Sequence, residues 1–290
     1  MLRAHPRVLD QNVPINIEAD SLNAAVLGRD VESGSDAMTL FLREVAKEIT
    51  QKAGQKCTAI RRILVPAERL ASVEAELAAR LAETKLGDPL REDVGMGPLA
   101  TSEQVAGVRA GVDLLRKDAD LVFGDPARLG ALAGVPEGKG YFFPIVLLRA
   151  RNSSEAPHVH SHEVFGPVAT LLPYGGAPEE AAAIVRRGQG GLVASIYSDD
   201  RKFIEECVLQ IAPYHGRVYI GGAKVHDQTT GSGTVLPSCV HGGPGRAGGG
   251  EELGGLRGLS RFMQRTAIQG YRPLVEAIAG VKAPSSGVPS

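Results

Sequence analysis

The sequence predicts an α/β fold built on a largely parallel sheet, and two observations support this prediction. Strand-like apolar runs alternate with amphipathic helical stretches between about residues 13 and 220, the order that produces a parallel sheet covered by helices. Hydrophobic residues make up 43% of the 290-residue chain. That content is enough to fill one large core or two smaller ones.

The first elements lead directly to a cysteine. Residues 13–27 are rich in Ile, Val and Ala and predict a strand that runs into a short loop. Ser35 and Asp36 offer a helix N-cap, apolar residues follow at helical spacing, and Gly54 is a stop signal. Cys57 is therefore expected just after a helix end, ahead of a buried strand at 60–65.

The remaining elements continue the alternation. Helices are predicted at 66–85, 102–118, 178–187 and 200–211, because apolar residues recur there on one helical stripe. Strands are predicted at 121–123, 141–148, 168–174, 192–197 and 217–220. Glycines concentrate after residue 216, where loops are expected to dominate.

The composition excludes several classes of function. Acidic and basic residues nearly balance, 33 against 32, so no large charged surface points to nucleic acid or to an anionic membrane. The longest apolar runs, at 145–148 and 168–172, are far too short to cross a bilayer. Three irregularly spaced cysteines argue against a disulfide framework. We therefore expect a cytosolic protein.

Cys57 and Glu18 are the strongest chemical candidates. Cys57 has polar and cationic sequence neighbours that favour a thiolate, whereas Cys207 lies in an apolar helix stripe and is expected to be a small buried hydrophobe. Glu18 lies at a strand end between apolar residues. It is either a base for thiol chemistry or the partner of an arginine in a salt bridge. The residues alone leave both pairs of alternatives open.

Two further patterns are weaker. His158, His160 and His162 alternate, which would put them on one face of a strand and could form a metal edge, but an exposed polar connection explains them better. Residues 243–248 match GxGxxG, yet more glycines follow and no acid lies in the downstream stretch 262–268. A flexible surface loop is the better interpretation of that match.

Four motifs in order resemble the aldehyde dehydrogenase superfamily. The resemblance extends to about Gly270. The motifs are an acid motif (Asn16-Ile17-Glu18-Ala19-Asp20-Ser21), a nucleophile motif (Gly54-Gln55-Lys56-Cys57), a cofactor-ribose motif (Glu163-Val164-Phe165-Gly166-Pro167) and a late glycine-rich element (Gly248-Gly249-Gly250-Glu251-Glu252-Leu253-Gly254). The resemblance implies a three-layer αβα catalytic domain with remnants of a Rossmann-type cofactor domain.

The resemblance also implies a mechanism and a substrate class. The segments 18–23, 241–246 and 263–267 look like those of enzymes that oxidise CoA-linked semialdehydes after aromatic ring opening, either stand-alone or as the dehydrogenase half of a bifunctional enzyme. By resemblance, Cys57 forms a thiohemiacetal and then a thioester, and Glu18 activates the hydrolytic water. Glu163 would hold the ribose and Phe165 would pack beside the nicotinamide of NADP, or of NAD. No metal is implied, and a homodimer is expected for the full-length enzyme.

The chain departs from the family pattern at its beginning. Only seventeen residues precede Glu18, too few for a βαβ unit or for the family's oxyanion-hole asparagine. We therefore expect a fragment with low activity, divided into residues 1–20 as the last cofactor-domain strand, 21–245 as the catalytic domain, 246–275 as a return to the cofactor domain with the oligomerisation strand, and 276–290 as a disordered tail. Two alternatives stay open, a cofactor-independent thiol hydrolase or acyltransferase, and a non-catalytic fragment.

Overall fold

A seven-stranded sheet forms the centre of the main unit in the computed structural model, which describes residues 2–236, 239, 241–248 and 255–280. The strand order is β4-β5-β6-β3-β2-β7-β8, and all neighbours are parallel except the pair β4 and β5. The strands are β2 (Ala24–Leu27), β3 (Arg62–Pro66), β4 (Ala119–Phe123), β5 (Val146–Ala150), β6 (Val168–Tyr174), β7 (Gly191–Tyr197) and β8 (His215–Gly221). The predicted parallel-rich α/β architecture is confirmed.

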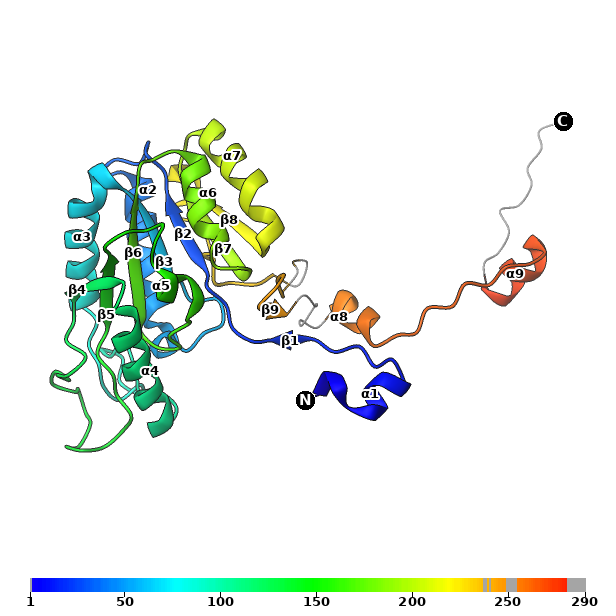
Figure 1. The fold of residues 1–290 in the computed structure, drawn as a ribbon, viewed down its shortest axis with the longest axis horizontal. Coiled ribbons are helices and arrows are strands. Elements are labelled where there is room, and N and C mark those ends of the chain that lie inside the picture. The colour runs from blue at the N-terminus through cyan, green and yellow to red at the C-terminus, as the bar shows by residue number, and fades with distance from the viewer. Residues whose placement is uncertain (1, 237–238, 240, 249–254, 281–290) are drawn as a thin grey trace. The chain divides into compact units, whose positions relative to one another are not determined.

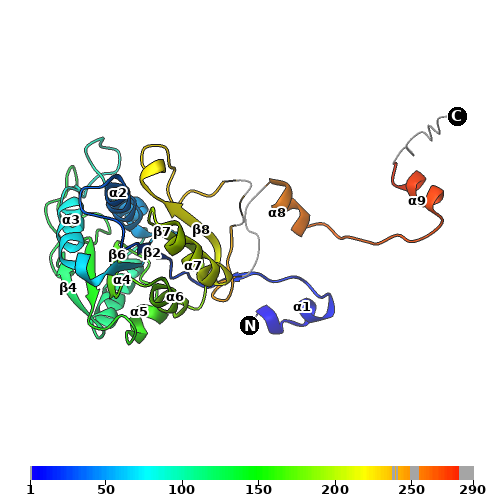
Figure 2. The ribbon, with the colours of Figure 1, turned by 90° about the horizontal axis from the view of Figure 1, so that it is seen from above.

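Helices cover both faces of this sheet. Helices α2 (Asp36–Thr50) and α3 (Leu70–Ala82) pack on one face, and α6 (Pro178–Arg186) and α7 (Arg201–Ile211) pack on the other (Figures 1 and 2). The three predicted layers are therefore present. The strands between the layers are buried on both sides, as parallel strands require, and β2, β3 and β7 consist only of buried residues.

The first helix of the core begins and ends as its sequence predicts. Ser35 is the N-cap of α2, and its side chain accepts a hydrogen bond from the backbone N–H of Met38. The apolar stripe of α2 is buried against the sheet. After Thr50 a short 3₁₀ turn leads to Gly54, whose φ of +69° only glycine adopts readily. Cys57 follows this helix end, as expected.

Two predicted strands differ by the largest amount from the strands of the structure. The segment 13–27 divides into a short strand β1 (Ile17–Glu18) and β2, because β1 pairs with β9 (Ala247–Gly248) outside the large sheet. The strand expected at 141–148 begins only at Val146. Pro144 explains part of this shift, since proline has no N–H to donate to a neighbouring strand.

The remaining α-helices lie in the main unit and in a second unit near the C-terminus. Among the described residues, no helix is long and apolar enough to cross a membrane. The remaining helices of the main unit are α1 (Pro6–Asp10), α4 (Ser102–Leu115) and α5 (Pro157–Ser161). The second unit, from Leu253 onward, contains α8 (Gly255–Arg261) and α9 (Arg272–Ile278). Helix α9 reaches into the segment predicted as a disordered tail, and residues 281–290 lie outside the described part.

Candidate active site

One pocket of about 490 Å³ brings the four predicted site residues together. Cys57, Glu18, Glu163 and Phe165 all line it, with contributions from residues 19–21 and from His162. The pocket lies beside the amino ends of the parallel strands, because Cys57 precedes β3 and Glu163 precedes β6. Ligands of open α/β sheets usually bind at the opposite ends of the strands. These residues are therefore assigned to the site by their motifs, not by their position relative to the strand ends.

The turn that carries Cys57 is held by a fully buried asparagine. Asn23, immediately before β2, donates from its side-chain amide to the carbonyl oxygens of Cys57 at 2.8 Å and Ala59 at 2.9 Å. Its amide oxygen accepts from the Ser21 hydroxyl at 2.7 Å and from the Val193 N–H at 3.0 Å. All four hydrogen-bonding positions of Asn23 are thus occupied. The nucleophile turn is fastened to two neighbouring strands of the sheet.

A buried ion pair joins the nucleophile turn to the cofactor motif. Arg61 donates from Nε to the Glu163 carboxylate at 3.1 Å, and its side chain is only 4% exposed. The two Nη atoms of Arg61 donate to the carbonyls of Gly166 and Gly54, each at 2.8 Å. Its guanidinium also lies 5.5 Å from the centre of the Phe165 ring. Arg61 therefore fixes the Glu163 segment and the Cys57 turn against each other.

The Glu163 carboxylate is buried but well provided with donors. Its second oxygen accepts from the Ser21 N–H at 3.0 Å, and its side chain is 7% exposed. Burial raises the pKa of this carboxyl, and the Arg61 guanidinium opposes that rise. Each carboxylate oxygen keeps further acceptor capacity toward the pocket. Beside it, the Phe165 ring is 41% exposed. An acceptor next to an open aromatic face suits a ribose and the attached nicotinamide, so these residues fit the implied cofactor.

Glu18 reaches the pocket on a separate two-stranded ribbon. It lies in β1, opposite Ala247 of β9, and the next N–H, of Ala19, donates to the Arg246 carbonyl at 2.9 Å. The Arg246 guanidinium forms an ion pair with Asp20 and also donates to the Ser161 carbonyl at 2.8 Å. The predicted strand-end position of Glu18 is present. The ribbon that holds it depends on a segment more than two hundred residues away in sequence.

The histidine segment is not an exposed connection, and this prediction is wrong. Residues 157–161 form helix α5, so the three alternating rings meet three different environments. His158 contacts Asp118, His160 is buried against Arg62 and the Ser153 carbonyl, and His162 lines the Cys57 pocket. Among the described residues, no group of three metal-ligating side chains is close enough to bind an ion.

The glycine segment 243–248 is not a flexible surface loop, and this prediction is also wrong. Gly242, Gly243 and Ala247 are buried, and Gly243 donates to the Ala247 carbonyl at 3.2 Å. A Cβ on Gly216 would lie 1.5 Å from the Gly242 oxygen. The glycines therefore permit close packing of backbone on backbone. The acid of the following motif, Glu252, lies outside the described residues.

Three residues of the site carry no role in the sequence-based prediction. Arg61 is one of the cationic sequence neighbours of Cys57, and Asn23 and His241 fall within the segments 18–23 and 241–246 that carry the resemblance. His241 is notable because its Nε2 atom lies 3.8 Å from the Cys57 sulfur. For Asn23 the one available signal was its place at the end of the segment 18–23. For Arg61 and His241 the contacts arise only in the fold.

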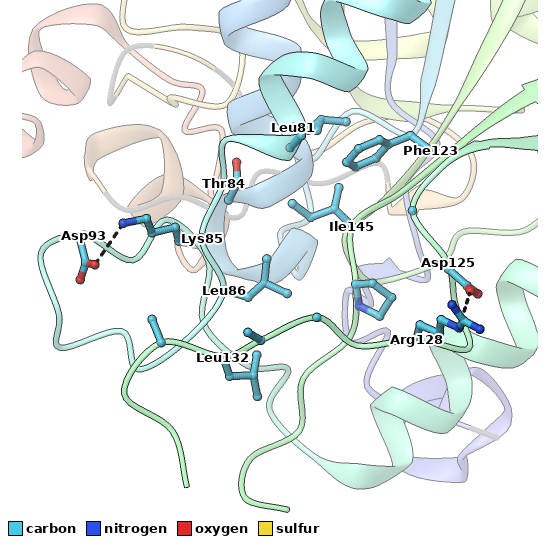
Figure 3. A pocket seen from close by; sticks show the side chains of 16 residues that line it. Leu81, Thr84, Lys85, Leu86, Asp93, Phe123, Asp125, Arg128, Leu132 and Ile145 are labelled. Carbon is cyan, nitrogen blue, oxygen red and sulfur yellow. Dashed lines mark hydrogen bonds and ion pairs between the residues drawn. The ribbon is translucent and has the colours of Figure 1, made fainter. Parts of the chain in front are cut away.

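A second pocket of about 520 Å³ lies elsewhere in the molecule and contains none of these residues. Its wall is mainly apolar, with Leu81, Phe123 and Ile145 pointing toward one another (Figure 3). The charged groups labelled at its rim pair among themselves, Lys85 with Asp93 and Arg128 with Asp125. Among the described residues that line it there is no cysteine, and both aspartates are paired. The smaller Cys57 pocket is therefore the candidate active site.

Comparison with known proteins establishes the family. The family model described as the aldehyde dehydrogenase family matches residues 13–268. The chain therefore belongs to the aldehyde dehydrogenase family. The fold agrees, since betaine aldehyde dehydrogenase from Staphylococcus aureus superposes with a TM-score of 0.74 at 22% identity over 88% of this chain and 46% of that one. Lactaldehyde dehydrogenase from Escherichia coli gives a TM-score of 0.71 at 23% identity, covering 88% and 48% of the two chains.

Two relatives in sequence show which members of the family this chain is similar to. The chain is 44% identical to a 3,4-dehydroadipyl-CoA semialdehyde dehydrogenase of Aromatoleum evansii over 84% of this chain and 47% of the relative. It is 41% identical to protein MaoC of Klebsiella aerogenes over 63% of this chain and 52% of that protein. The resemblance to CoA-linked semialdehyde dehydrogenases is confirmed at this level. The chain spans about half the length of these relatives.

Proposed function

We propose that this chain carries the nucleophile-bearing part of an enzyme that oxidises an aldehyde to a carboxylic acid with NAD(P) as hydride acceptor. The observation that carries the proposal is the convergence of Cys57, Glu18, Glu163 and Phe165 on one pocket. The identity to a semialdehyde dehydrogenase favours a CoA-linked semialdehyde as the substrate. NADP is the preferred acceptor in this proposal and NAD the alternative. A homodimer in the cytosol is the proposed state of the complete enzyme.

Each residue has one task in this reaction. The Cys57 thiolate attacks the aldehyde carbon and forms a thiohemiacetal, whose oxyanion accepts a hydrogen bond from the Cys57 backbone N–H. A nicotinamide bound beside Glu163 and Phe165 would supply the hydride acceptor, and loss of the hydride leaves a thioester on Cys57. Glu18 then takes a proton from the water that attacks the thioester carbonyl. The C–S bond breaks, the carboxylic acid departs and Cys57 is released as a thiolate. Glu163 orients the ribose through its carboxylate, which Arg61 and Ser21 hold in place.

Trapping the thioester tests this division of labour. Glu18→Gln, incubated with a CoA-linked semialdehyde and millimolar NADP or NAD, is expected to accumulate an acyl group on Cys57, detected by peptide mass spectrometry, with one equivalent of reduced cofactor. Wild type is expected to accumulate less, and Cys57→Ser none. If the chain instead hydrolyses thioesters at Cys57 without nicotinamide and forms no acyl group from the aldehyde, the thiol hydrolase alternative replaces this proposal.

A further inference from the structure

His241 contacts the nucleophile directly. Its Nε2 atom lies 3.8 Å from the Cys57 sulfur, close enough for the thiol to donate a weak hydrogen bond to the ring nitrogen. A nucleophile with a basic ring in contact is the arrangement that activates thiols in many enzymes. The proposed function leaves this ring without a task, since Glu18 serves the later hydrolytic step.

Both partners of this contact stand on buried supports. On one side Asn23 fixes the Cys57 carbonyl at 2.8 Å from its amide nitrogen. On the other side His241 is followed directly by Gly242, whose backbone packs so tightly on Gly216 that a Cβ there would be 1.5 Å from the Gly242 oxygen. The backbone on each side of the contact is therefore packed against a buried neighbour.

The positive charges near the pair favour the thiolate form of Cys57. Arg61 and Arg217 both interact electrostatically with Cys57, and their positive charges stabilise its anionic form. Lys56, the residue before the nucleophile, is paired with Glu48 at 2.8 Å. Among the described residues that line the pocket, the other titratable groups are Glu18, Asp20, Glu163 and His162.

We propose that His241 accepts the proton of the Cys57 thiol, so that the nucleophile is already a thiolate when the aldehyde arrives. The S–H bond breaks, an N–H bond forms at Nε2, and nothing is oxidised or reduced. Glu18 is thereby left free of this first proton and serves only the water that cleaves the thioester. This inference rests on the proposed role of Cys57, but its test uses neither aldehyde nor nicotinamide.

Site-resolved alkylation of the folded 290-residue chain tests the proposal. Iodoacetamide labelling of Cys57, followed by peptide mass spectrometry between about pH 6 and pH 10, gives the pH midpoint of its reactivity. In wild type the midpoint is expected well below the value of about 8.5 for an ordinary thiol. In His241→Asn it is expected to rise toward that value, with the rate near pH 6.5 falling roughly threefold to tenfold. Above about pH 9 the order reverses, because a more basic thiolate is the better nucleophile.

Two controls separate this effect from general damage. His226→Asn changes a histidine on the same connection that hydrogen-bonds the Ala223 carbonyl, and it is expected to leave the Cys57 midpoint unchanged. Labelling of Cys239 in the same samples shows whether the substitution has changed the accessibility of the neighbouring chain. Ultraviolet absorbance of the thiolate in wild type minus Cys57→Ser measures the midpoint without any His241 variant. A wild-type midpoint near 8.5, or equal midpoints in wild type and His241→Asn, would overturn the proposal.

Discussion

Mild acid is expected to destabilise the folded chain through one buried histidine. His160 is 4% exposed, its Nε2 lies 2.7 Å from the Ser153 carbonyl, and its Nδ1 lies 3.3 Å from Nη1 of Arg62. The neutral ring satisfies both partners, because Nε2–H donates to the carbonyl while Nδ1 accepts from the guanidinium. Burial, reinforced by the Arg62 charge, lowers the pKa of His160 from 6.5 to about 4.

The size of the effect follows from these two pKa values. Above pH 6.5 the ring is neutral in both the folded and the unfolded chain, so the full stability is present. As the pH falls from 6.5 toward 4, only the unfolded chain binds the proton, and the free energy of unfolding decreases. One pH unit corresponds to about 1.4 kcal/mol, so His160 accounts for a loss of about 2 kcal/mol by about pH 5.

Urea unfolding followed by circular dichroism measures this loss. The free energy of unfolding is determined for wild type and His160→Gln at about pH 7.5 and pH 5, and the quantity of interest is the wild-type value minus the variant value. This difference cancels the other titrating groups and is expected to fall by about 2 kcal/mol. His215→Gln is a second variant for the same measurement and is expected to behave similarly, because burial lowers the pKa of His215 to about 4 as well. A difference for His160→Gln that does not change with pH would refute the reasoning.

Two other substitutions test the supports of the nucleophile turn. Asn23→Ala removes the amide donor from the buried Ala59 carbonyl and from the partly buried Cys57 carbonyl. It is expected to lower the free energy of unfolding by about 2–4 kcal/mol, measured by urea unfolding. An unchanged urea midpoint would contradict the inference that the Asn23 hydrogen bonds stabilise the fold. Gly54→Ala places a methyl group 2.1 Å from the Gly166 oxygen at a φ of +69°, and a loss of more than about 2 kcal/mol is expected in thermal melts. Gly107→Ala is its control, since nothing lies within 4 Å of that position in α4, and a gain of up to about 1 kcal/mol is expected there.

The regular elements follow from local patterns in the sequence. The cap at Ser35 and the apolar stripe after it specify α2, and the apolar run at 168–174 matches β6, whose bounds are Val168–Tyr174. These signals are local, because a cap, a stripe or a buried run is complete within one element. The order of the strands in the sheet is not local. It depends on which strands pair, and no single segment of the sequence contains that information.

The site was predictable only where motifs identify it. Glu18 and Cys57 stand in motifs, and the pocket contains both. The strand that supports Glu18 has two residues and owes its existence to its pairing with Ala247 and Gly248. The histidine segment was misjudged for a related reason. A buried polar ring such as His160 requires partners from other elements, here Arg62 and Ser153, and sequence patterns assign polar residues to the surface by default.

The two proposed catalytic groups, Cys57 and Glu18, are held by supports of different strength. Cys57 is held by Asn23 within the seven-stranded sheet, so thiol reactivity depends on the most buried part of the fold. Glu18 is held by a ribbon of two residue pairs and by the Asp20–Arg246 ion pair at its side. A disturbance of the ribbon is therefore expected to impair thioester hydrolysis while the thiol still reacts. For this reason alkylation of Cys57 and release of its acyl group are independent measurements, and each reports on one of the two supports.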